Sequence, residues 1–146
     1  MVRLNLFNEF FYEVNAGAFL SAKQTHLPDY KHFQVNESFL SSKPFNTSFT
    51  MDNYRYATNE RWLQAHVTYS SQYLLIKQIP FLQRLPVSEA IHLKTVWTPD
   101  VNHNEAGYSL GLGNIGRVGI FVGFRKQHYN NFGFVLSLPI FNTISK

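Results

Sequence analysis

Cysteine is absent from this chain of 146 residues, and several kinds of protein are excluded with it. Without a thiol there is no disulfide framework, no thiolate zinc site and no cysteine nucleophile. No apolar run approaches the roughly 18–20 residues of a membrane-spanning helix, which excludes a helical membrane protein. The opening residues also lack the basic region and apolar stretch of a secretory signal. If the protein works outside the cytoplasm, we therefore expect an N-terminal portion to precede Met1.

Charge is also scarce. Charged residues make up 15% of the chain, against roughly 25% in an average soluble domain. The net charge is +4, but Lys and Arg are dispersed and form no basic run. Nucleic-acid binding is therefore not expected.

Aromatic residues, by contrast, are abundant, with 14 Phe and 8 Tyr, and hydrophobic residues reach 45%. That composition rules out disorder. The length is that of a single domain, so multi-domain architectures and long repeat arrays are excluded.

Six segments alternate between apolar and polar side chains, as β-strands do because successive side chains point to opposite faces. The expected strands are 4–20, 62–71, 89–98, 108–112, 117–125 and 132–140. Stretches rich in turn residues, at 21–31, 41–50, 99–106 and 127–131, separate most of them. Between the second and third strands, residues 73–85 show helical spacing and contain Pro80, which predicts a short helical connector. The expected fold is all-β, an antiparallel meander.

Alternation fits a soluble sandwich or a small ligand-binding barrel as well as a membrane barrel. The polar face favours the membrane barrel, because it carries glycine and uncharged polar residues where a solvated surface would carry charge. Five glycines lie on that face: Gly17, Gly111, Gly119, Gly123 and Gly133. We expect it to line a lumen. The opposite face would contact lipid, and near the chain's end it consists of Leu110, Leu112, Val118, Ile120, Val122, Phe124, Phe134, Leu136 and Leu138. Aromatic residues near strand ends, among them Trp97, Tyr108 and Tyr129, fit interfacial girdles.

Four motifs occur in an order that resembles a known family: Asp29-Tyr30-Lys31-His32-Phe33, then the stretch 56–62 with Thr58-Asn59-Glu60, then Lys77-Gln78-Ile79-Pro80, then Gly111-Leu112-Gly113-Asn114-Ile115. Together they look like the C-terminal barrel region of a Gram-negative outer-membrane family of unassigned function. Its members carry an N-terminal carboxypeptidase-regulatory-like domain, and the region is similar to the barrels of the BamA and TamA assembly proteins.

The resemblance implies a structural segment of an outer-membrane barrel with no chemistry of its own, whose parent protein serves outer-membrane assembly or transport. Implied partners are membrane lipid, the missing N-terminal part of the barrel and the outer-membrane assembly machinery. The chain is then either a fragment or a truncated stand-alone version. The final alternating segment resembles the terminal-strand signal that this machinery captures by pairing a strand edge, and its residues are Phe132, Phe134, Leu136, Leu138 and Phe141.

No motif predicts a reaction or a cofactor. Residues 111–116 match the glycine-rich dinucleotide fingerprint, but an alternating strand follows where that fingerprint needs a helix, so a turn is expected instead. The six histidines never stand at the close spacing of a metal clip, although His66 and His92 lie on polar faces of separate strands and could meet. No serine lies in a nucleophile elbow, and Glu9 with Glu13 are more simply lumen carboxylates. We expect no enzyme, no cofactor and no metal.

Overall fold

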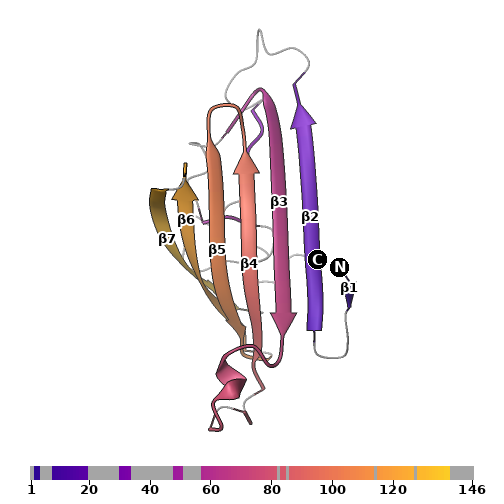
Figure 1. Ribbon diagram of the computed structural model, residues 1–146, viewed down its shortest axis with the longest axis vertical. Coiled ribbons are helices and arrows are strands. Elements are labelled where there is room, and N and C mark those ends of the chain that lie inside the picture. Colours follow the sequence, from indigo (N-terminus) through magenta and orange to yellow (C-terminus); the bar gives the residue numbers. More distant parts are fainter. Residues whose placement is uncertain are drawn as a thin grey trace.

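A computed structural model describes residues 2–3, 8–19, 30–33, 48–50, 57–81, 83–84, 86–113, 115–126 and 128–138. These residues form one antiparallel sheet, and its strands lie side by side in chain order (Figure 1). The strands are β1 (Val2–Arg3), β2 (Asn8–Ala18), β3 (Arg61–Ser71), β4 (Ser88–Trp97), β5 (Asn102–Gly111), β6 (Arg117–Arg125) and β7 (His128–Ser137). The expected all-β antiparallel meander is confirmed.

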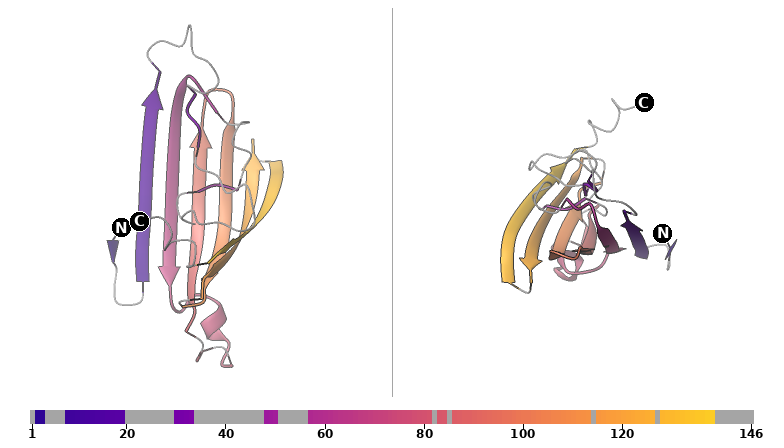
Figure 2. Two further views of the ribbon diagram at one scale, coloured as in Figure 1. Left: turned by 180° about the vertical axis from the view of Figure 1, so that it is seen from behind. Right: turned by 90° about the horizontal axis from the view of Figure 1, so that it is seen from above.

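The sheet is curved and does not close into a barrel (Figure 2). Within the described residues, β1 pairs only with β2 and β7 pairs only with β6. Both edges of the sheet are therefore open in the part of the chain that the structure describes.

A helical connector between β3 and β4 is not shown. The structure has a single 3-10 turn there, η2 (Ile76–Gln78), whose following residue Ile79 is already extended. Leu75 and Ile79, whose apolar spacing suggested a helix, are both exposed. Among the described residues, no helix is long and apolar enough to cross a membrane.

Two stretches that were expected to be turns are strands. β5 begins at Asn102 and β7 at His128, so the polar runs 102–106 and 128–131 belong to the sheet. Pairing across the sheet overrides their local turn preference. The hydroxyl of Thr95 donates to Asn104 Oδ1 at 2.8 Å, and Asn131 Nδ2 donates to the backbone oxygen of Thr50. The glycine-rich run after β5 is a turn, as expected, since β6 follows it and Gly113 has a φ of 53°.

One face of the sheet is polar and covered, and the other is apolar and exposed. We call them the inner face and the outer face. On β4, the inner residues Ala90, His92 and Lys94 are buried, while the outer residues Ile91 and Leu93 are exposed. The same alternation continues along β3, β5 and β6. This arrangement is the reverse of a soluble sheet, which buries its apolar side.

Short segments from the β2–β3 connection lie on the inner face. We call residues 48–50 the inner strap. Phe49 of the strap is fully buried and forms a small core with Phe33 and Val96, against which Trp62 and Val101 pack. The strap runs across the inner side of the sheet (Figures 1 and 2).

Candidate functional site

A row of polar residues crosses the middle of the inner face. Strand register aligns one residue from each of six strands, and the row consists of Glu13, His66, Lys94, Glu105, Gly123 and Asn131. The strap lies over this row. The row and the strap together are the candidate functional site.

The centre of the site is a buried ion pair between neighbouring strands. Lys94 Nζ lies 3.2 Å from Glu105 Oε1, and the two side chains are 1% and 0% exposed. The ammonium group is enclosed by two aromatic rings, 4.1 Å from the centroid of Phe121 and 6.0 Å from that of Phe49. Such rings attract a cation electrostatically, so Lys94 is held by a carboxylate and by ring faces at once.

The ion pair fastens the strap to the sheet. Lys94 Nζ donates to the backbone oxygen of Ser48. Glu105 Oε2 accepts from the backbone N–H of Thr50 at 2.8 Å and from its hydroxyl at 2.7 Å. On the far side, Asn131 Nδ2 donates to the backbone oxygen of Thr50 at 2.8 Å. Three strands thus bind the strap through its polar groups.

The glycine on β7 makes room for the strap. A Cβ added at Gly133 would lie 2.6 Å from Thr50 Cβ, closer than real Cβ contacts occur. The glycines of the polar face were expected to line a lumen, and at this position the side chain that lies against the glycine is that of Thr50.

The inner histidines take structural roles in this arrangement. His66 packs against Phe49, with 4.7 Å between ring centroids and the rings tilted by 51°, and shares a hydrogen bond with Gln64. His92 is hydrogen-bonded at both ring nitrogens, to Thr68 Oγ1 at 2.9 Å and to Ser109 Oγ at 2.8 Å. Register pairs His66 with Lys94 and His92 with Thr68, so the two histidines do not pair with each other. In the described part of the chain, no three metal-ligating side chains cluster.

We call the Lys94–Glu105 pair, with its contacts to the strap, the latch. Each carboxylate oxygen of Glu105 already binds a donor, and Lys94 Nζ is enclosed by its carboxylate, a backbone oxygen and two rings. The polar groups of the pair are thus engaged with the strap and with each other. The geometry of the latch therefore serves to position residues 48–50.

The outer face carries the residues that were predicted to contact lipid. Ile120 and Phe134 are 46% and 47% exposed, and Leu112 and Phe124 are also exposed. The partly exposed members are Leu110, Val118, Val122, Leu136 and Leu138. Of the predicted terminal-strand signal, Phe132 and Phe134 are exposed on β7, whereas Phe141 lies outside the described residues.

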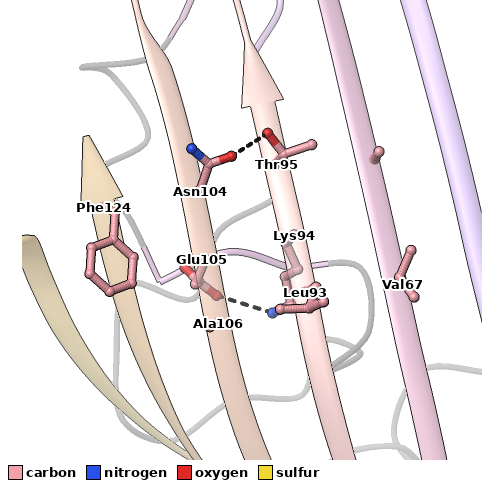
Figure 3. A pocket seen from close by; sticks show the side chains of 9 residues that line it. Val67, Leu93, Lys94, Thr95, Asn104, Glu105, Ala106 and Phe124 are labelled. Atoms are coloured by element: carbon pink, nitrogen blue, oxygen red, sulfur yellow. Dashed lines mark hydrogen bonds and ion pairs between the residues drawn. The ribbon is translucent and has the colours of Figure 1, made fainter. Parts of the chain in front are cut away.

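A hollow of about 250 Å³ opens on this outer face, where small side chains replace larger ones. Ala65 and Ala106 form part of its lining, and Leu93, Val67 and Phe124 flank it (Figure 3). The Lys94–Glu105 pair lies on the other side of the same strands, so a single layer of backbone separates the hollow from the latch.

Sequence reasoning missed a second polar centre, at the other end of β4. Glu89 has the parity of the outer residues, yet it is fully buried. Its carboxylate accepts from the backbone N–H groups of Leu75 at 2.7 Å and of Ile76 at 3.0 Å, and from the hydroxyl of Tyr108. A carboxylate two positions before Ile91, on the apolar parity, was the available signal.

Neither a curated protein nor a solved structure matches the chain. A family model does match, over residues 1–110, and it describes the C-terminal domain of a family of unknown function, DUF5686. The matched range contains β1 to β4 and nearly all of β5, including Lys94, Glu105, Glu89 and the strap. Of the four motifs behind the family resemblance, three lie within it. The chain belongs to the DUF5686 family, of which it carries the C-terminal domain.

Proposed function

We propose that this chain is a structural segment of an outer-membrane β-barrel, with its outer face against lipid, its inner face toward the lumen and no chemistry of its own. The observation that carries the proposal is the inverted polarity of the sheet: apolar side chains are exposed on one face, while polar and charged side chains are buried on the other. In water the exposed apolar face would be an aggregation hazard.

The apolar side chains of neighbouring strands lie in register, so they form one continuous apolar face across the sheet. One row joins six strands through Phe10, Tyr69, Ile91, Tyr108, Ile120 and Phe134. The next consists of Tyr12, Val67, Leu93, Ala106, Val122 and Phe132. Along β3 the outer apolar residues extend from Leu63 to Tyr69, which is about 20 Å at the rise of a strand. Strands of outer-membrane barrels tilt by roughly 35–45°, so this length covers part of an apolar band that is roughly 25 Å tall.

The composition of the inner face supports the proposal that it lines a lumen. It carries Gln64, His66, Thr68, His92 and Ser109, all buried, and the strap covers its centre. Barrels of this kind alternate apolar-out with polar-in and are often plugged by a segment of the same chain.

A soluble ligand-binding barrel or sandwich is not favoured. That alternative needs the apolar face to line the interior, but the interior side here is the polar one. In the part of the chain that the structure describes, the edges at β1 and β7 are open, which fits a sheet that further strands complete. We propose that those strands come from additional polypeptide or from further copies of this chain, and that the parent protein acts in outer-membrane assembly or transport.

Spin labelling tests the orientation directly, since the absence of cysteine makes each introduced cysteine unique. Labels at Leu93→Cys and Ile120→Cys, in the chain reconstituted into phosphatidylcholine vesicles, should collide with dissolved oxygen and be shielded from a water-soluble nickel complex. A label at Asp100→Cys, in the exposed β4–β5 turn, should show the opposite. Free access of the nickel complex to Leu93 and Ile120 would overturn the proposal.

A further inference from the structure

The connection between β3 and β4 exposes a cluster of apolar and aromatic side chains. We call residues 72–81 the connector. Phe81 is 88% exposed, Tyr73 61%, Leu75 58% and Ile79 50%. The connector projects from one end of the sheet (Figure 1).

The connector is nonetheless firmly attached to the outer face. Glu89 holds the backbone N–H groups of Leu75 and Ile76, at 2.7 Å and 3.0 Å, and also accepts from Tyr108. Gln78 Nε2 closes the turn by donating to the backbone oxygen of Leu74 at 2.7 Å. Tyr108 itself belongs to the apolar row that contains Ile91 and Ile120. The hydrogen bonds of Glu89 thus join the connector to the face proposed to contact lipid.

The charged residues of the connector and of the residues that follow it up to Ser88 are all basic. Between Gln72 and Ser88 the sequence contains Lys77 and Arg84 and no acidic residue. Glu89, the next carboxylate along the chain, is fully buried beneath its donors. Exposed aromatic and aliphatic side chains beside the exposed Arg84, with no exposed carboxylate among the described residues of this stretch, complement the phosphate-rich zone of a bilayer.

We infer that the connector is an interfacial anchor that inserts Tyr73, Leu75, Ile79 and Phe81 among lipid headgroups at one end of the barrel, with Glu89 as the clamp that holds it there. This inference rests on the proposed function. It adds a lipid contact beyond the strands and identifies its chemistry as the phosphate-bearing headgroup region.

Fluorescence quenching by depth tests the anchor. The variants Phe81→Cys, Ile120→Cys and Asp100→Cys each receive one environment-sensitive fluorophore, and the chain is reconstituted into vesicles of phosphatidylcholine and phosphatidylglycerol. The vesicles carry a nitroxide quencher either at the headgroup or near the acyl chain end. We expect the Phe81 label to be quenched mainly from the headgroup, the Ile120 label mainly from the acyl chain, and the Asp100 label far less than the Phe81 label by either.

The outcomes separate the two proposals. If the Phe81 label is as weakly quenched as the Asp100 label while the Ile120 label is quenched by the acyl chain, the anchor is wrong and the barrel proposal stands. If neither the Phe81 label nor the Ile120 label is quenched, both the barrel proposal and the anchor are wrong. Shielding of the Phe81 label from iodide without vesicles would assign the cluster to contact between copies and would also overturn the anchor.

A separate variant tests the role of Glu89 as the clamp. Glu89→Gln keeps the shape of the side chain but weakens acceptance of the two backbone N–H groups. In this background the headgroup quenching of the Phe81 label should fall at least twofold, with the quenching of the Ile120 label unchanged. Equal headgroup quenching of the Phe81 label with Glu89 and in the Glu89→Gln background would show that Glu89 does not hold the connector in place.

Discussion

Ile120 lies mid-strand on the outer face, between Tyr108 and Phe134 on the neighbouring strands. Ile120→Arg should destabilise the chain in bilayers by roughly 2–4 kcal/mol, the cost of arginine near the midplane of a membrane barrel. The matched control is Asn102→Arg at the exposed start of β5, where a surface substitution changes stability by about 0.5 kcal/mol or less. Urea unfolding from vesicles measures both variants. Similar small effects would contradict lipid contact at Ile120.

The Lys94–Glu105 pair should behave as a coupled unit. Glu105→Gln leaves the Lys94 ammonium buried without its counter-charge, and losing one partner of a buried pair costs about 3–5 kcal/mol. The double variant Lys94→Met with Glu105→Gln should cost clearly less than the sum of the two single variants, because no isolated charge remains. Denaturant unfolding of the four proteins in the cycle provides the coupling energy. Strict additivity would show that the pair is not a latch.

Thr50 and Gly133 test the contact between the strap and β7. Gly133→Ala places a methyl group 2.6 Å from Thr50 Cβ, and overpacking of this kind costs about 1–3 kcal/mol. Thr50→Gly removes the crowding atoms, so the added cost of Gly133→Ala should largely disappear in that background. An unchanged cost would mean that the strap does not lie over β7.

At the scale of elements, the connector gives a prediction about local stability. Glu89→Ala leaves two backbone N–H groups and the Tyr108 hydroxyl without their acceptor, and each unsatisfied group costs about 1–3 kcal/mol. Amide hydrogen exchange at Leu75 and Ile76 should therefore accelerate, while exchange in the centre of β4 changes little. Asp100→Ala is the control. Unaltered protection at Leu75 and Ile76 would contradict the clamp.

The strands were predictable where alternation is strict. β3 and β4 were placed to within a few residues because apolar and polar side chains alternate along them. The starts of β5 and β7 were missed because Asn102, His103 and Asn131 favour turns locally, and only pairing with neighbouring strands makes them extended. The polarity of the two faces was also predicted, but which solvent each meets is still a proposal.

The candidate site could not be derived from the sequence, because its contacts are long-range. Thr50 meets Glu105 across 55 positions and Asn131 across 81 positions of the chain. No spacing rule connects such residues. His66 and His92 were singled out for their parity, and the structure gives each of them partners that only the register of the sheet reveals.

At the scale of the whole molecule, the open edges decide how the isolated chain behaves. Within the described residues, strands β2 to β7 fall short of the eight strands of the smallest membrane barrels. In vesicles, copies of the chain should therefore associate edge to edge. Chemical cross-linking should trap dimers or larger species, and dilution should favour proteolysis of the monomer. A heat-resistant monomer in lipid would refute this expectation, since it would require a sheet closed within one chain.

The alternation of inner and outer side chains also makes strand pairing in the wrong register energetically unfavourable. Leu93 and Lys94 are neighbours in sequence but face opposite sides of one layer of backbone. If β4 slipped by one residue against β3, Lys94 and His92 would face outward and Leu93 inward. A small pairing mistake thus becomes a large energetic penalty that grows with each additional paired residue. Misaligned strands should separate early in folding, before the error spreads to the next hairpin.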